Sequence, residues 1–316
     1  MFWDIVLLVV GMVLLIKGAD FFVDGSSKIA KAFHIPSLII GLTLVSMGTS
    51  APELSVSLNA TLSGSNEICL GNVVGSNLCN TLLILGLSAI FVPLLITKDM
   101  KKFDIPILVG LYVLMILFAF VISPESLDRI EAIILLLVFV GYLALLLIRA
   151  KKESQAAVEE EEEKISKRKL ALSGVLAIIG LAAIIFGGDL VVDSASNIAT
   201  KFGMSETLVG LTIVAVGTSL PELVTSVVAA IKKENDIAVG NVIGSNIFNV
   251  LLILGATATI KPLAINSAVM IDLVILLGTG LIVLLISQLF KDIKRWHGII
   301  LVVLYVAYLA YIIVRG

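Results

Sequence analysis

Charged residues are scarce in this chain of 316 residues, where Asp, Glu, Lys and Arg together make up 15%. Hydrophobic residues make up 59%, and the mean hydropathy is +1.12. These values lie far outside the range of soluble domains. The composition therefore excludes a soluble enzyme and a nucleic-acid-binding protein, and it indicates a polytopic membrane protein.

Cysteine and histidine are also rare, with two residues of each. Cys69 and Cys79 fall within one apolar run, so we predict no disulfide framework and expect both to be helix-packing residues. His34 and His297 lie near predicted cytoplasmic loops, and no nucleophile stands beside a base. We therefore expect the protein to be neither an enzyme nor the holder of a cofactor.

Long apolar runs are what the chain has in abundance. A membrane-spanning helix needs about 20 such residues. Ten runs meet this requirement, at residues 3–23, 36–61, 68–95, 103–122, 128–149, 170–192, 205–230, 237–260, 266–289 and 295–315. The first run carries Asp4, Lys17 and Asp20 and lacks a basic lead and a small-residue cleavage site, which predicts a retained span and not a signal peptide. We predict an all-α protein with ten transmembrane helices.

One strongly polar stretch separates the fifth run from the sixth, from Lys151 to Lys169. Its acidic run, Glu159–Glu163, has neither the spaced ligands nor the glycine of a calcium-binding loop, so we predict a solvated tether. The predicted organisation is a five-helix repeat over residues 1–149, a charged linker over 150–169 and a second five-helix repeat over 170–316.

An internal duplication connects the two halves. Residues 41–86 align with residues 210–255 at a constant offset of 169, with 26 of 46 positions identical and no gap. The shared residues include Gly, Thr, Ser, Pro, Glu and Asn, which membrane composition alone does not explain. Because each half has an odd number of predicted spans, the second copy should enter the membrane from the opposite side, as an inverted repeat.

The distribution of basic residues tests this orientation independently. With the amino terminus outside, the cytoplasmic loops and helix ends collect 17 Lys and Arg residues, the outer side collects four, and Lys17 lies inside a span. Cytoplasmic loops of membrane proteins carry an excess of basic residues. We therefore predict that both termini face outward and that the linker is cytoplasmic.

The sequence GTSAPE at residues 48–53 returns as GTSLPE at residues 217–222. A proline inside a helix cannot donate the usual backbone hydrogen bond, so each motif should break its helix and free carbonyl groups near residues 46–49 and 215–218. Inside a membrane, freed carbonyl groups are tolerated only where protein or a wet cavity surrounds them. The two motifs therefore predict a polar site in the interior.

Each break places a carboxylate beside hydroxyl groups. The carboxylates are Glu53 and Glu222, and the hydroxyls belong to Thr49, Ser50, Thr218 and Ser219. Calcium binds about six to eight oxygen atoms, and two carboxylates balance its charge. A structural role as a protonated pair is the alternative, but an ionisable residue inside the membrane indicates function by default.

Two further repeated segments, GNVVGSNLCN (71–80) and GNVIGSNIFN (240–249), follow the motifs. Each places a serine and an asparagine four residues apart on one helix face: Ser76 with Asn80, and Ser245 with Asn249. The glycines of these segments, Gly71, Gly75, Gly240 and Gly244, allow the broken helix to approach closely. For Asn72, Asn77, Asn241 and Asn246, helix packing and ion binding explain the pattern equally well.

The two motif copies resemble the alpha-repeats of the cation/calcium antiporter superfamily, in particular its prokaryotic sodium/calcium exchanger-type members. The resemblance implies ten helices as five plus five inverted, four central cation sites and a prokaryotic inner (plasma) membrane. It implies that Glu53 and Glu222 bind calcium, with backbone carbonyls from Thr49 and Thr218. It further implies sodium sites completed by the carbonyls of Ser46 and Ala215 with Ser76 and Ser245, and a middle position closed by Asn80 and Asn249. Some relatives carry Asp at one of these last two positions, and Asn at both weakens the case for potassium co-transport.

We therefore expect an antiporter that exchanges calcium for sodium. The ions compete for the two glutamates, and an empty charged pocket should be reluctant to change sides, which gives obligatory exchange. The first and sixth spans should slide, with Asp20, Asp24, Asp189 and Asp193 at their polar ends.

Two alternatives remain open. A calcium/proton antiporter would use the same glutamates, and a cation channel would use the same oxygens without coupling. The expected partners are the ions and the lipid bilayer, with no required oligomer.

Overall fold

The computed structural model describes residues 1–63, 66–157, 167–204 and 215–315. The first half comprises α1 (Phe2–Ala32), α2 (Ser37–Ile40), η1 (Gly41–Val45), α3 (Ser46–Thr49), α4 (Ala51–Leu62), α5 (Asn66–Leu78), η2 (Cys79–Ile84), α6 (Leu85–Phe91), β1 (Leu94–Leu95), η3 (Met100–Asp104), α7 (Ile105–Leu117), η4 (Phe118–Ile122), β2 (Ser126–Leu127) and α8 (Arg129–Ala157). The second comprises α9 (Lys167–Lys201), α11 (Ala215–Gly217), α12 (Leu220–Ile231), α13 (Asn235–Phe248), η6 (Asn249–Leu254), α14 (Gly255–Ile260), β3 (Leu263–Ala264), α15 (Ser267–Leu289), β4 (Asp292–Ile293) and α16 (Arg295–Arg315). The η elements are π-helical turns that continue an adjoining α-helix.

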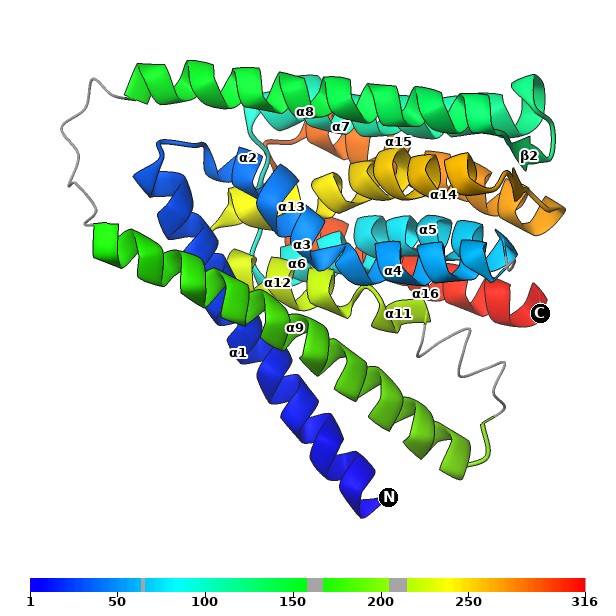
Figure 1. The fold of residues 1–316 in the computed structure, drawn as a ribbon, viewed down its shortest axis with the longest axis horizontal. Coiled ribbons are helices and arrows are strands. Elements are labelled where there is room, and N and C mark those ends of the chain that lie inside the picture. The colour runs from blue at the N-terminus through cyan, green and yellow to red at the C-terminus, as the bar shows by residue number, and fades with distance from the viewer. Residues whose placement is uncertain (64–65, 158–166, 205–214, 316) are drawn as a thin grey trace.

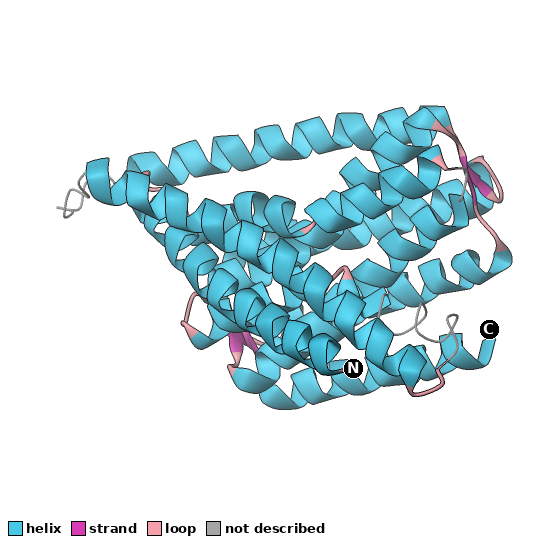
Figure 2. Ribbon diagram, turned by 60° about the horizontal axis from the view of Figure 1, so that its bottom comes forward, coloured by secondary structure: helices cyan, strands magenta, loops and turns pink. Residues whose placement is uncertain are grey.

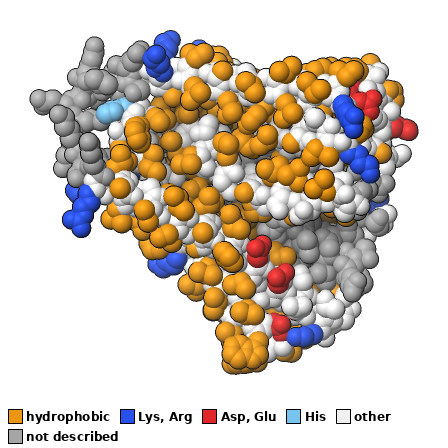
Figure 3. Space-filling view, in the orientation of Figure 1, with side chains coloured by type: hydrophobic (Ala, Val, Ile, Leu, Met, Phe, Trp, Pro, Cys, Tyr) orange, Lys and Arg blue, Asp and Glu red, His pale blue; other side chains and the backbone are white. Residues whose placement is uncertain are grey.

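The described helices include eight that are long and apolar enough to span a membrane. Figure 3 shows apolar side chains over most of the visible face, with Lys and Arg side chains mainly toward its two ends. This arrangement fits a protein whose solvent is lipid around its middle. The predicted span 205–230 includes residues outside the described part, and its described portion forms α11 and the short apolar helix α12.

Proline breaks the second predicted span, as the motif predicts. Residues Ser37–Thr49 and Ala51–Leu62 form two helices bent by 46°, with Ser50 between them. Pro52 stands in the first turn of α4, where its missing N–H costs no helical hydrogen bond. Pro221 has the same place in α12, after Ser219.

The two long helices α1 and α9 pack side by side and cross the rest of the molecule obliquely (Figure 1). Glycine allows their backbones to touch, because a Cβ atom on Gly18 would lie 2.7 Å from the carbonyl oxygen of Gly180. Both helices are longer than predicted, since the residues after positions 23 and 192 and before position 170 contain no proline and continue the helix.

Two small antiparallel sheets join the halves. Strand β1 pairs with β4 and β2 pairs with β3, so each sheet takes one strand from each half. Figure 2 shows the two sheets at opposite ends of the molecule. They are the one departure from the predicted all-α class among the described residues, and each strand has only two residues.

Helices extend from both sides into the predicted linker, residues 150–169. Helix α8 continues to Ala157 and α9 begins at Lys167, so both polar flanks are helical. The acidic run Glu159–Glu163 lies outside the described residues. Cys69 and Cys79 are both buried and free.

Candidate ion-binding site

Two buried glutamates begin the helices that follow the breaks. Glu53 lies in the first turn of α4 and Glu222 in the first turn of α12, and both are fully buried. The first turn of a helix favours negative charge, because its free N–H groups carry a partial positive charge. The breaks therefore place each carboxylate where the local backbone stabilises it.

Two serine hydroxyl groups connect the breaks crosswise. Ser50 Oγ donates to Glu222 Oε1 at 2.9 Å, and Ser219 Oγ donates to Glu53 Oε1 at 3.3 Å. Each serine belongs to one half and its carboxylate partner to the other. Ser245 Oγ is also 3.5 Å from Glu222 Oε1. The two motifs thus meet in one buried site, as the sequence predicted.

Two asparagines hold this arrangement from the neighbouring helices α5 and α13. The side-chain amides of Asn72 and Asn241 donate to the main-chain carbonyl of the glutamate of their own half, at 3.3 and 3.4 Å. Their Oδ1 atoms accept from the other half, Asn72 from Thr218 at 3.5 Å and Asn241 from Thr49 at 3.1 Å. These residues therefore position the breaks, a role that the sequence left open between packing and ion binding.

A second set of asparagines lies where α5 and α13 pass into π-helical turns. Asn80 Nδ2 donates to Asn246 Oδ1 at 3.1 Å, and Asn249 Nδ2 donates to Asn77 Oδ1 at 2.9 Å. Such turns often occur at functional sites. Because the amide nitrogens are engaged in this way, the oxygens of Asn80 and Asn249 are left for other partners.

Five buried oxygen atoms around the site have no hydrogen-bond partner among the described residues. They are Glu53 Oε2, Glu222 Oε2, Asn80 Oδ1, Asn249 Oδ1 and Ser76 Oγ. A buried oxygen without a donor is unfavourable and rare in native proteins. Carboxylate, amide and hydroxyl oxygens are also the ligands that hard cations prefer.

One of the predicted backbone ligands already accepts a helical hydrogen bond. Ser46 is buried, and its carbonyl oxygen accepts from Ser50 N at 3.0 Å. The reason is positional, since a proline at position 52 removes the helical bond to residue 48 and leaves the bond to residue 46 intact. Ala215 is the first residue of α11, where Ser219 N donates to Val216 O.

A cavity of about 390 Å³ reaches the site from one end of the molecule. Its lining includes Ser76 and Thr218 at the site and Asp272 and Arg315 at the ends of α15 and α16. Gly71 in its wall is exposed. The repeat-related glycine, Gly240, is instead buried, and a Cβ atom there would lie 2.9 Å from Leu38 O.

The aspartates of α1 and α9 also differ between the halves. Lys232 forms ion pairs with Asp20 at 2.5 Å and Asp24 at 2.6 Å. Partial burial disfavours the charge of Lys232, but the two carboxylates outweigh it and raise the pKa of its ammonium group. Asp189 and Asp193 line a cavity of about 480 Å³ beside the two breaks. None of the four caps a helix, because all lie within α1 or α9.

Comparison with known proteins identifies this arrangement. The family described as "sodium/calcium exchanger protein" matches this chain over residues 3–148 and 172–314. The chain belongs to this family. Both halves are matched, and the gap between the matches falls on the linker, so the exchanger match covers both copies of the GTSxPE motif and both glutamates.

Individual relatives agree with the family. The sodium/calcium exchanger MaX1 of Methanosarcina acetivorans is 36% identical over 97% of each chain. The inner membrane protein YrbG of Escherichia coli is 38% identical over 81% of this chain and 79% of its own. A solved structure of the sodium-calcium exchanger NCX_Mj superimposes with a TM-score of 0.85 at 33% identity, covering 98% of each chain. The chain is therefore an integral membrane protein of a transporter family with this fold.

Proposed function

We propose that this exchanger is a secondary active antiporter that exchanges calcium for sodium at the site formed by Glu53 and Glu222. The observation that carries the proposal is the set of buried oxygens without hydrogen-bond partners among the described residues, which includes one oxygen of each glutamate. A cation bound between the glutamates would satisfy these oxygens. Membership of the family supports calcium and sodium as the cations.

Charge balance supplies the coupling in this proposal. The two carboxylates neutralise one calcium ion or two protons, or they hold sodium ions with one charge in excess. Calcium and the counter-ion therefore compete for the same groups. A pocket with two bare carboxylates is costly to bury, so the empty protein is reluctant to change sides and exchange becomes obligatory.

Alternating access would come from two inverted five-helix repeats, residues 1–149 and 170–316, joined by the linker 150–169. The polar contacts support this symmetry, because the bond from Ser50 to Glu222 recurs, at the offset of 169, as the bond from Ser219 to Glu53. Movement of one repeat against the other around the shared site would open it to each side of the membrane in turn.

The proposed orientation has both termini outside and the linker in the cytoplasm of a prokaryotic cell. Figure 1 supports it, since both termini lie toward one side of the molecule and the helix ends that border residues 158–166 lie toward the other. The name of the relative YrbG, an inner membrane protein, supports the inner membrane as the location.

Cysteine labelling tests this orientation. A cysteine introduced at position 160 should react with a membrane-impermeant maleimide only after the cells are opened, because the linker is cytoplasmic. The native Cys69 and Cys79 are buried and should give little background. Reaction of position 160 from outside intact cells contradicts the orientation.

Purified protein in proteoliposomes tests the coupling ion. An imposed sodium gradient should drive calcium uphill, because sodium and calcium draw on the same carboxylates, whereas a pH gradient without sodium should not. Uphill calcium movement driven by the pH gradient alone would establish the proton-coupled alternative, which uses the same two glutamates. Downhill calcium movement that no gradient can reverse would indicate a channel.

A further inference from the structure

An ion pair stands in the wall of the cavity that reaches the site. Arg315, at the end of α16, holds Asp272 of α15 through two contacts, at 2.8 Å from Nη1 to Oδ1 and 3.0 Å from Nη2 to Oδ2. The guanidinium also lies over the ring of Tyr311, 5.1 Å from its centroid. The Asp272 side chain is 10% exposed and the Arg315 side chain 28%, so solvent screens the pair only in part. Paired in this way, the two residues add no net charge.

The same cavity ends at an ion-site residue. Ser76 lines this cavity and is 1% exposed. Its hydroxyl group is buried and has no hydrogen-bond partner among the described residues. Asp272 and Arg315 are the charged residues among those described in its lining, and the wall between consists of residues such as Gly71, Tyr305 and Leu309. A cation that travels through this cavity to Ser76 therefore passes one carboxylate and one guanidinium.

We propose that Asp272 and Arg315 together keep the path to the site electrostatically neutral, so that neither calcium nor sodium is favoured on its way there. The pair acts on the ions through its electric field, and this inference rests on the proposed exchange of calcium for sodium. While the two residues neutralise each other, the path favours neither ion. Loss of either partner leaves a single charge beside the path.

Valence makes this effect selective. A fixed charge beside a path changes the local concentration of a cation by a Boltzmann factor whose exponent is proportional to the charge of the cation. The factor for a divalent ion is therefore the square of the factor for a monovalent ion. A free carboxylate attracts both cations and calcium more; a free guanidinium repels both and calcium more. A purely structural ion pair predicts no such relation.

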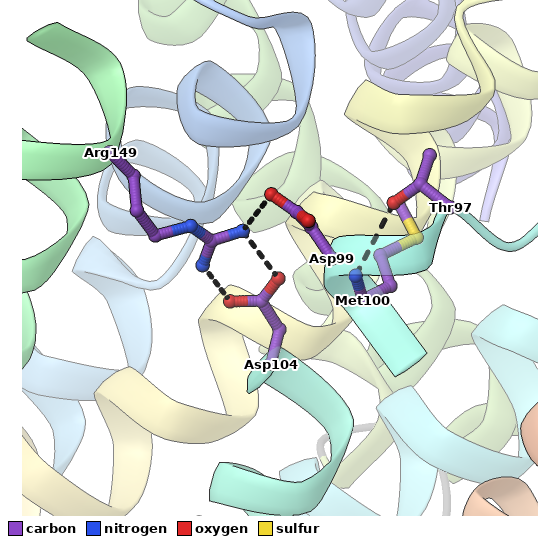
Figure 4. Close-up of polar contacts among 5 residues, drawn as sticks. All are labelled: Thr97, Asp99, Met100, Asp104 and Arg149. Carbon is purple, nitrogen blue, oxygen red and sulfur yellow. Dashed lines mark hydrogen bonds and ion pairs between the residues drawn. The ribbon is translucent and has the colours of Figure 1, made fainter. Parts of the chain in front are cut away.

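The other end of the molecule holds a similar ion pair that serves as a matched control. Arg149 binds Asp104 at 2.7 Å and Asp99 at 3.2 Å (Figure 4). Like the proposed pair, it joins an arginine to an aspartate that lies within an apolar run. Neither Asp104 nor Arg149 is in the lining of the cavity that reaches Ser76.

The test measures, in proteoliposomes, the calcium and sodium concentrations that half-saturate exchange from the side that the C-terminus faces. Arg315→Gln should lower the value for calcium roughly fourfold and that for sodium roughly twofold, and Asp272→Asn should raise both by the same factors. The double variant should return to the parent values. Raising the ionic strength with choline chloride should shrink the shifts in both single variants, because salt screens partly exposed charges.

Arg149→Gln and Asp104→Asn should leave the calcium-to-sodium ratio of half-saturating concentrations at the parent value. Arg315→Lys, which keeps the charge and loses the two-pronged contact, should also stay near the parent. If one neutral variant fails to fold, the calcium and sodium shifts of the other and their decrease with ionic strength decide the question. The inference is wrong if Arg315→Gln and Asp272→Asn shift the half-saturating concentrations in the same direction. It is also wrong if a variant changes the calcium and sodium values by the same factor. An inactive parent protein would instead defeat the proposed exchange itself.

Discussion

Glu53→Gln and Glu222→Gln should each reduce calcium transport roughly 100-fold or more, because each removes one of the two charges that balance a divalent cation in a buried site. The protein should still fold. The oxygen that accepts from Ser219 or Ser50 is retained in a glutamine side chain, so the crosswise hydrogen bonds can persist. Calcium-45 flux in proteoliposomes is the measurement, with size-exclusion profiles to confirm the fold.

A third buried glutamate supplies the control for this result. Glu131 is 2% exposed and accepts from Asp128 N at 2.8 Å, at the start of α8 and away from the breaks. Glu131→Gln should cost some thermal stability and leave calcium flux near the parent rate. If either site variant keeps substantial calcium exchange while remaining folded, the two halves do not share one site.

The breaks and their carboxylates were predictable because their cause is local. Proline has no N–H, so its position fixes where a helix must start again, and the structure has Pro52 and Pro221 in the first turns of α4 and α12. Helix ends were less predictable. Apolar content decides where lipid contact stops, but a helix continues into water until proline, glycine or a cap ends it, as α1 does up to Ala32.

The hydrogen-bond partners within the site could not be predicted from the sequence, because they depend on how the two halves pack together. The repeat pattern shows that Ser50 and Glu222 both matter, but only the packed structure pairs the serine of one half with the glutamate of the other. The ion pair of Asp104 with Arg149 had a visible signal, since a charge inside an apolar run needs a partner. Its partner could not be named without the packing of α8.

Neutral asparagines in the middle position should make the protein only moderately sensitive to acid, and one substitution tests this. Asn249→Asp adds a third carboxylate near two others, and neighbouring like charges favour protonation. The new side chain also faces Asn77 Oδ1, which accepts from the present amide at 2.9 Å, so only a protonated carboxyl group could donate in its place. Both effects raise proton affinity. Calcium flux of the variant should therefore fall at a pH roughly one unit higher than in the parent.

Two further variants make this shift in pH dependence specific. Asn80→Asp should behave like Asn249→Asp, because Asn80 makes the repeat-related bond to Asn246 Oδ1 at 3.1 Å. Asn59→Asp, on the exposed side of α4, should leave the pH profile unchanged. Flux is measured against pH with sodium and then potassium on the opposite side, and potassium should not replace sodium in any variant. An unshifted profile for Asn249→Asp would place residue 249 outside the ion pocket, since calcium and protons must compete for a carboxylate inside it.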